Sequence, residues 1–285
     1  MQGYAELHCL SNFSFLRGAS HPEELVAQAH ALGYSALAIT DECSVSGVVR
    51  AHEKARELGF KLIVGAELRL ADGPDLVLLA TDRTGYGQLC RLITRGRRSA
   101  AKGSYLLHRR DLQQDLSHCL ALLLPRLREE PEQVQWFAGT FPGQGWLAVE
   151  LLRDGSDAGR LEKTAAWARK YDLPRVAAGG VRMHRRGRRP LGDLLTAIRL
   201  NRPVAHLGRE RLPNGERHLR RLDDLAALYP AELLDETQRL ARRCRFSLNE
   251  VAYQYPDDVT PPGTTPRAWL RRLTEQGTRA RWPQG

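Results

Sequence analysis

The stretch that most constrains this chain is Ala5–Gly18, where a short apolar segment runs into a polar loop. Ser20, Pro22 and Glu23 follow, and this order predicts a helix start with Ser20 as the N-cap and Glu23 completing a capping box. A strand, a loop and a helix are therefore expected at the N-terminus. In α/β barrels the reactive side chains lie where strands end, and His8 is the first residue of this chain in such a position.

The same unit of strand and helix repeats along the chain. Further strands are expected at residues 35–40, 61–64, 76–80, 119–124, 146–152 and 175–178. Helices are expected at residues 20–32, 48–58, 86–94 and 161–171. This alternation favours parallel strands with helices outside. The number of units suits a (β/α)7 barrel but does not by itself separate it from an eight-fold barrel or a doubly wound sheet.

The character of the chain changes after His184. Helical patterns continue at residues 191–200, 222–229, 231–243 and 269–277, and a proline-rich stretch, expected to be an extended linker, covers residues 253–266. We therefore predict an α/β barrel over residues 1–230, followed by a helical extension and linker over residues 231–285.

Charge and cysteine content limit the classes of protein that fit. The chain carries a net charge of +10, which favours polyanionic partners such as nucleic acid, although a solvated basic surface explains it equally well. The densest basic runs supply the candidate nucleic-acid contacts: Arg95, Arg97, Arg98, Lys102, Arg185 and Arg186. The five cysteines show no C-x-x-C spacing, so a reducing cytoplasm is expected. No apolar run is long enough for a membrane span.

Three motifs carry a family resemblance. The stretch Tyr4–Gly18, the run Ala36–Glu42 and the run Val64–Glu67 together resemble the PHP (polymerase and histidinol phosphatase) domain. More narrowly, residues 7–18 and 39–44 resemble the start of the error-prone, DnaE-type C-family DNA polymerases, the ImuC group. This resemblance continues in register to the last residues of the chain. The resemblance favours a distorted, seven-stranded PHP barrel over the other α/β architectures.

A working PHP site, as the resemblance implies, holds two or three divalent metal ions with His, Asp and Glu side chains, and metal-bound water attacks phosphorus. This sequence keeps few of those ligands. Two positions match, at His8 and Glu67. Three positions carry carboxylates instead of histidine, at Glu42, Asp75 and Asp154. The remaining positions fall on Leu10, Arg17, Gly180 and Arg182.

We therefore expect a vestigial pocket with no catalytic residue and no cofactor. In it, His8, Glu42 and Glu67 would form ion pairs with Arg17 and Arg182 in place of metal–ligand bonds. The alternative that the sequence leaves open is one weak manganese or zinc site. Its candidate ligands would be His8, Glu42, Glu67, Asp75 and Asp154.

The resemblance implies a parent enzyme that copies damaged templates during induced mutagenesis, with Mg²⁺ held by a palm domain that this stretch lacks. The expected role of the stretch is structural: a rigid barrel packed against palm and thumb, meeting primer–template DNA through the parent enzyme. Mutasome proteins and the sliding clamp are the protein partners that the resemblance suggests. The alternatives are a residual phosphoesterase or exonuclease and a non-enzymatic nucleic-acid-binding module.

Overall fold

The computed structural model describes residues 3–125, 130–251 and 260–284. The chain divides into two compact units, Met1–Glu250 and Val251–Gly285. In the second unit the described residues form one helix, α9 (Pro266–Arg281), whose first turn is capped by the Thr265 hydroxyl accepting a hydrogen bond from the Ala268 amide. The first half of the linker expected at residues 253–266, residues 253–259, lies outside the described residues.

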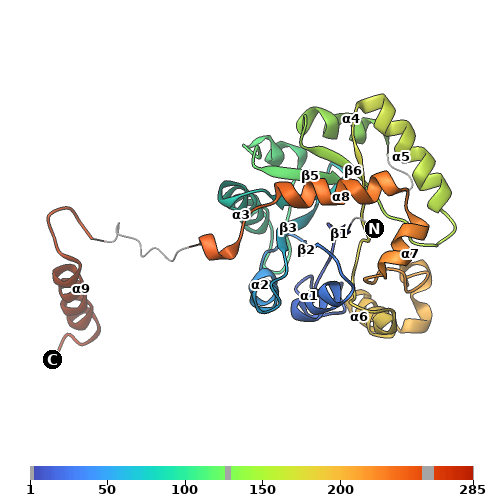
Figure 1. Ribbon diagram of the computed structural model, residues 1–285. Helices are drawn as coiled ribbons and strands as arrows, with labels where there is room; N and C mark the ends of the chain where they lie inside the picture. Colours follow the sequence, from blue (N-terminus) through green and yellow to red (C-terminus); the bar gives the residue numbers. More distant parts are fainter. Residues whose placement is uncertain (1–2, 126–129, 252–259, 285) are drawn as a thin grey trace. The chain divides into compact units, whose positions relative to one another are not determined.

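The first unit is built on a curled, seven-stranded sheet (Figure 1). The strands lie side by side in the order in which they occur in the sequence. They are β1 (Ala5–Glu6), β2 (Ala36–Ile39), β3 (Leu62–Arg69), β4 (Asp75–Ala80), β5 (Cys119–Leu123), β6 (Gly145–Val149) and β7 (Arg175–Ala177). This confirms the α/β class and the seven strands of the expected barrel.

One strand differs from the prediction that neighbouring strands are parallel. β4 pairs antiparallel with both β3 and β5, whereas all the other neighbouring pairs are parallel. The reason is the connection before it: residues 70–74 are too few for the crossover that a parallel pair requires. β3 also continues past Val64 to Arg69, so Glu67 lies within a strand and not beyond its end.

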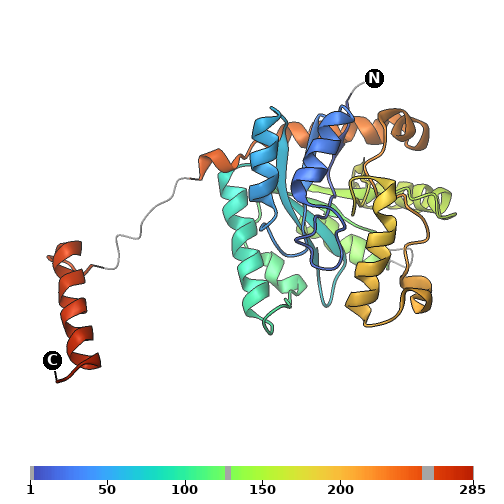
Figure 2. The same cartoon turned by 90° about the horizontal axis from the view of Figure 1, so that it is seen from below.

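Helices surround the sheet, on its outer surface and at one end (Figure 2). In chain order they are α1 (Pro22–Ala31), α2 (Val48–Glu57), α3 (Arg83–Arg98), α4 (Pro131–Thr140), α5 (Asp157–Tyr171), α6 (Arg189–Leu200), α7 (Leu222–Leu228) and α8 (Ala231–Arg243). The helix start at α1 is shifted by one residue from the prediction. His21 is the N-cap and its amide donates to Glu24, because the Ser20 hydroxyl is engaged with His184.

α8 closes the end of the barrel at which most strands begin. Its residues Leu240 and Ala241 pack among the inward-facing side chains of the strands. The Thr237 hydroxyl accepts a hydrogen bond of 3.2 Å from the amide of Ala5, the first residue of β1. The Trp146 indole near the start of β6 donates to Glu236 at 2.9 Å. The compact unit therefore extends past the boundary predicted at residue 230 and includes this helix.

The two edge strands meet through a short seam at the opposite end. Cys9 and Val181 form a parallel bridge just beyond β1 and β7. The buried Glu6 carboxylate accepts hydrogen bonds from the amides of His8 at 3.0 Å and Gly179 at 2.9 Å. Gly179 has to be glycine, because a Cβ there would lie 2.4 Å from a Glu6 oxygen. The side-chain carboxylate of Glu6 thus accepts hydrogen bonds from backbone amides where the pairing between strands ends.

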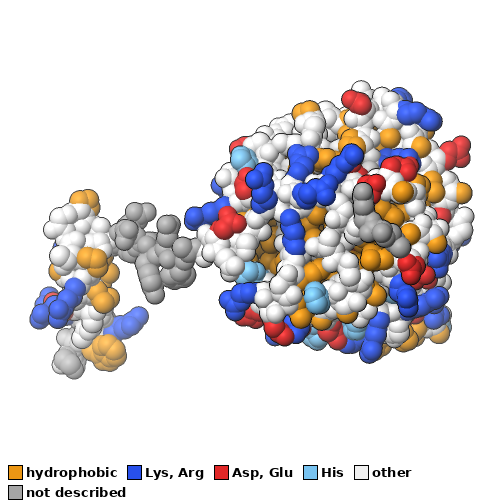
Figure 3. Space-filling model, in the orientation of Figure 1, with side chains coloured by type: hydrophobic (Ala, Val, Ile, Leu, Met, Phe, Trp, Pro, Cys, Tyr) orange, Lys and Arg blue, Asp and Glu red, His pale blue; other side chains and the backbone are white. Residues whose placement is uncertain are grey.

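Arginine and lysine side chains gather over α8 on the face shown in Figure 3. Arg239, Arg242 and Arg243 of this helix are exposed, and the Arg243 guanidinium stacks over the Trp146 ring at 5.0 Å. None of the helices in the described part of the chain combines the length and the apolar character that a membrane crossing requires.

We expect Thr237→Val to lower the free energy of unfolding by about 1–2 kcal/mol, because it leaves the buried Ala5 amide without its acceptor. Urea denaturation would measure the loss. Thr196→Val in α6 is the matched control, since the Thr196 hydroxyl donates only to its own helix, at Gly192. Equal losses in the two variants would refute the role of Thr237 in closing the barrel.

Candidate functional site: a chain of ion pairs in the barrel mouth

His8 lies at the centre of the barrel mouth, between two carboxylates from distant strands. Its Nε2 atom is 2.8 Å from a Glu67 oxygen in β3, and its Nδ1 atom is 2.7 Å from a Glu150 oxygen just after β6. His8 and Glu67 are almost completely buried. Because both ring nitrogens face carboxylates, the ring donates from both nitrogens and is an imidazolium.

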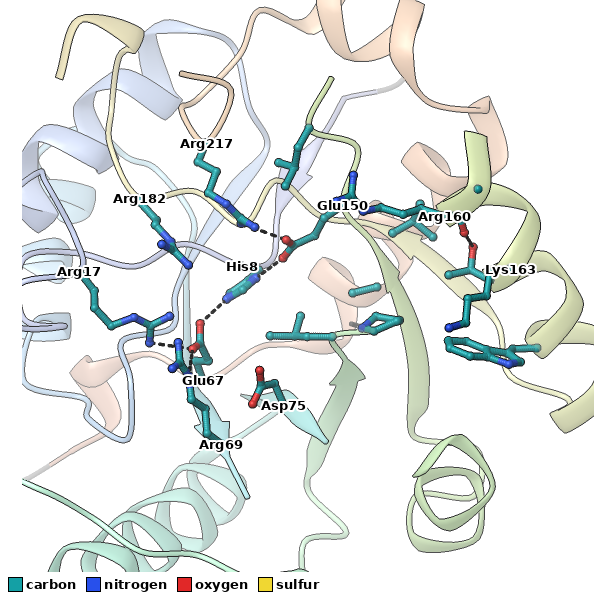
Figure 4. Close-up of a pocket in the computed structure, with 18 residues that line it drawn as sticks. His8, Arg17, Glu67, Arg69, Asp75, Glu150, Arg160, Lys163, Arg182 and Arg217 are labelled. Atoms are coloured by element: carbon teal, nitrogen blue, oxygen red, sulfur yellow. Dashed lines mark hydrogen bonds and ion pairs between the residues drawn. The ribbon is translucent and has the colours of Figure 1, made fainter. Parts of the chain in front are cut away.

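Arginines occupy the outer ends of this arrangement. Arg17 forms an ion pair with Glu67 at 2.8 Å and a second with Glu42. Arg217 forms an ion pair with Glu150 at 3.0 Å and donates to the Gly180 carbonyl. Figure 4 shows the resulting ion-pair chain, in which positive and negative groups alternate in the order Arg17, Glu67, His8, Glu150 and Arg217.

The loop after β1 carries Arg17 into the mouth because Asp41 organises it. The buried Asp41 carboxylate accepts hydrogen bonds from the amides and hydroxyls of both Ser11 and Ser14, at 2.7–3.1 Å. Gly18 then lets the loop fold back on itself, since a Cβ there would lie 1.9 Å from the Ser11 carbonyl oxygen. This packing explains the polar composition of the stretch with which the sequence analysis began.

The ion pairs shift the pKa values of His8, Glu150 and Glu67. Burial lowers the pKa of His8, but the hydrogen bonds to Glu150 and Glu67 outweigh burial and raise it from 6.5 to about 9. Burial raises the pKa of Glu150, but Arg217 and His8 lower it to about 2. For Glu67, too, burial is outweighed, by His8 and Arg17, and the pKa falls well below its ordinary value. All these groups are therefore charged at neutral pH.

The ion-pair chain lies against a pocket of about 250 Å³. Asp75 and Arg69 line it beside Glu67, and Arg182 lines it between Arg17 and Arg217 (Figure 4). Among the described residues Arg182 has no carboxylate within ion-pair distance, which differs from the expected pairing of this arginine. Burial, together with the charges of Arg217 and Arg17, lowers the pKa of Arg182 to about 9.

The structure brings together four of the five predicted ligand positions. His8, Glu42 and Glu67 are joined through the ion pairs, and Asp75 lines the same pocket. Asp154 is placed apart, in a two-point ion pair with Arg160 at 2.6 and 2.7 Å. The carboxylate of Asp154 thus joins the loop before α5 to Arg160 of that helix.

Glu150 and Arg217 are the site residues that the sequence analysis missed. Glu150 stands at the end of an apolar strand, and a carboxylate in that position was the one available signal. Arg217 lies 67 positions further along the chain, in a loop whose sequence shows no motif. The sequence around Arg217 therefore gives no indication that its side chain pairs with Glu150 in the barrel mouth.

The atoms that would ligate a divalent metal are engaged in ion pairs in this arrangement. An imidazolium has no free nitrogen lone pair for a metal, and the oxygens of Glu67 already accept from His8 and Arg17. Within residues 3–125, 130–251 and 260–284, no group of three or more His, Cys, Asp or Glu side chains is arranged to hold a metal ion. The arrangement can instead hold the mouth together by electrostatic attraction.

The predicted nucleic-acid contacts have different surroundings. Arg97 donates to the carbonyls of Cys43 and Glu42 and stacks on Tyr105, so it fixes the loop after β2. Arg95 faces Asp111 at 3.7 Å and Arg186 faces Glu216 at 3.5 Å. The other three side chains are exposed: Arg98, Lys102 and Arg185.

Comparison with known proteins identifies the family. A sequence profile of the PHP domain matches residues 6–170. The chain belongs to the PHP domain family. It is also similar, over 99% of its length and at 57% identity, to the error-prone DNA polymerase of Methylococcus capsulatus, and over its whole length, at 56% identity, to that of Pseudomonas aeruginosa. The chain spans 27–28% of the length of these relatives and corresponds to their N-terminal region.

The fold of this PHP domain also has a counterpart among solved structures. A protein from Bifidobacterium adolescentis, described as a metal-dependent phosphoesterase, superimposes with a TM-score of 0.50. The match covers 63% of this chain and 88% of that protein at 15% sequence identity. At this identity the similarity concerns the fold alone, and it confirms the PHP-like arrangement of the curled sheet and its helices.

The raised pKa of His8 predicts how stability depends on pH. The ion pairs of the imidazolium contribute fully below pH 6.5 and are lost as the pH rises through about 9. On the order of 3 kcal/mol of the free energy of unfolding should disappear across that window. Urea denaturation at a series of pH values would measure it. In His8→Gln, which cannot titrate, the curve should be flat over the same window; an unchanged curve would contradict the assignment.

Proposed function

We propose that this chain is the N-terminal PHP region of an error-prone DNA polymerase and that it acts there as a non-catalytic structural domain. The observation that carries the proposal is the 52–57% identity, over essentially the whole chain, to a series of error-prone DNA polymerases. On this proposal the parent enzyme copies damaged templates, and nucleotide transfer takes place in a palm domain with Mg²⁺.

The chemistry of the barrel mouth supports a structural role. A hydrolytic PHP site needs neutral imidazoles and free carboxylates around metal ions. Here the imidazole of His8 is protonated and Arg17 approaches the carboxylates, so cationic side chains neutralise the acidic groups. A residual phosphoesterase or exonuclease would require this network to open, which favours the structural role over an enzymatic one.

The proposed partners follow from the parent enzyme. The barrel would pack against palm and thumb and help to order primer–template DNA, with the sliding clamp and mutasome proteins as further partners in the cytoplasm. The exposed arginines of α8 and those at Arg98 and Arg185 supply positive charge for phosphate contacts. A free-standing nucleic-acid-binding module is the competing role, and it predicts salt-dependent DNA affinity of the chain by itself.

A chimeric polymerase tests the structural role. This chain would replace the matching region of the Methylococcus capsulatus enzyme, and primer extension should be retained. At low temperature, the same chimera carrying His8→Gln should extend primers at the same rate as the unmodified chimera. On heating, it should be inactivated at a temperature below that of the unmodified chimera, because the ion-pair chain is broken. Primer extension and the unfolding temperature of each chimera would be measured in parallel.

Deletion of the matching region from the Methylococcus capsulatus enzyme is the control, and it should abolish extension if the domain supports the palm. Loss of extension or of a nuclease activity in a folded His8→Gln chimera would instead assign chemistry to the pocket and overturn the structural role.

Metal content gives an independent prediction. After incubation with Mn²⁺ or Zn²⁺ and desalting, the purified chain should retain well below one metal ion per molecule, because ion pairs occupy the donor atoms. Mass spectrometry would measure it. Retention of one or more ions, lost in both His8→Ala and Glu67→Ala, would support the alternative of a weak metal site.

A further inference from the structure

Among the described cations around the pocket, Arg182 differs from its neighbours. Arg17 is paired with Glu67, Arg217 with Glu150, and Arg160 with Asp154. The Arg182 guanidinium lines the same pocket, yet no described carboxylate pairs with it. Its backbone is held in place, because its amide donates to the Arg217 carbonyl at 2.9 Å. The backbone of Arg182 is therefore fixed next to the pocket, and none of the described carboxylates lies within ion-pair distance of its guanidinium.

This position is electrostatically unfavourable as it stands. Arg182 has Arg17 on one side and Arg217 on the other (Figure 4). Burial and these two like charges lower the pKa of Arg182, and they outweigh the attraction of Glu67 and Glu150, neither of which lies within ion-pair distance. A partly buried cation without a counter-ion destabilises a fold. A bound anion would remove that penalty.

The composition of the pocket lining points the same way. Among the residues that the structure describes, six Lys or Arg side chains and three carboxylates line the pocket: Arg17, Arg69, Arg160, Lys163, Arg182 and Arg217 against Glu67, Asp75 and Glu150. His8 adds a further positive charge between two of the carboxylates. A metal-binding pocket is rich in carboxylates and attracts cations. The lining of this pocket carries an excess of positive side chains, so it favours anions.

We propose that this pocket binds a phosphate group, either as inorganic phosphate or as the terminal phosphate of a small ester, with Arg182 as its principal ligand. Arg17 and Arg217 flank Arg182, so donors reach the cavity from several directions. A tetrahedral oxyanion has acceptor oxygens on every side and suits such donors better than a planar carboxylate. The guanidinium fork of Arg182 matches two phosphate oxygens at once.

Isothermal titration calorimetry of the full chain, at constant ionic strength in a chloride buffer, tests the site. The two probes are inorganic phosphate and a nucleoside 5′-monophosphate. At least one should bind, and Arg182→Gln should weaken binding by about tenfold or more, as expected for a lost charged hydrogen bond. Binding of phosphate alone would identify the free anion as the ligand, whereas binding of the monophosphate alone would identify an ester.

Arg209→Gln is the matched control, because Arg209 is exposed and outside the pocket lining, and its affinity should equal that of the wild type. Arg182→Lys keeps the charge but loses the fork, so its affinity should fall between those of wild type and Arg182→Gln. Without phosphate, Arg182→Gln should melt at a higher temperature than wild type, since the unfavourable charge is gone. Absence of binding by both probes, or equal weakening in Arg182→Gln and Arg209→Gln, would overturn the proposal.

This site does not depend on the polymerase assignment. The calorimetric result concerns the isolated chain, whereas the chimera tests its role within a larger enzyme. A chain that binds phosphate but fails to support primer extension would leave the pocket proposal standing and remove the structural one.

Discussion

The contact on which the rest of the site depends is the imidazolium of His8 between Glu67 and Glu150. It joins strand β3 to the segments that directly follow β1 and β6. The two carboxylates then attract Arg17 and Arg217 at their outer oxygens. Removing one partner of a buried ion pair leaves an uncompensated buried charge and is strongly destabilising, so loss of any one of the five groups should weaken the contacts of its neighbours.

The same reasoning connects the fold to the proposed loss of catalysis. In a metal-dependent PHP enzyme the acidic groups at the barrel mouth repel one another, and metal ions neutralise them. In this chain Arg17 and the protonated His8 perform that neutralisation. These ion pairs can stabilise the barrel mouth in place of metal ions, which suits a domain whose proposed task is to support a palm. The surplus arginine, Arg182, is what makes the pocket a candidate phosphate site.

Two elements outside the mouth complete the barrel. α8 closes the opposite end, with Thr237 capping the amide of β1, and the Glu6 carboxylate joins the edge strands where backbone pairing stops. Both contacts satisfy buried backbone groups that would otherwise destabilise the fold. Each joins segments far apart in the sequence: Ala5 and Thr237 are separated by 232 residues, and Glu6 and Gly179 by 173.

Sequence alone determined the elements whose signals are local. The apolar runs and helix patterns predicted all seven strands and most helices, and the polar loop with His8 and Glu67 predicted the position of the site. Tertiary structure decided the direction of β4, the inclusion of α8 in the barrel unit, and the partners of each charge. The physical reason is range. A helix or strand follows from neighbouring residues, whereas the contact of His8 with Glu150 spans 142 residues. Only the closed barrel brings these two residues together and places Arg182 beside the pocket with no described carboxylate at ion-pair distance.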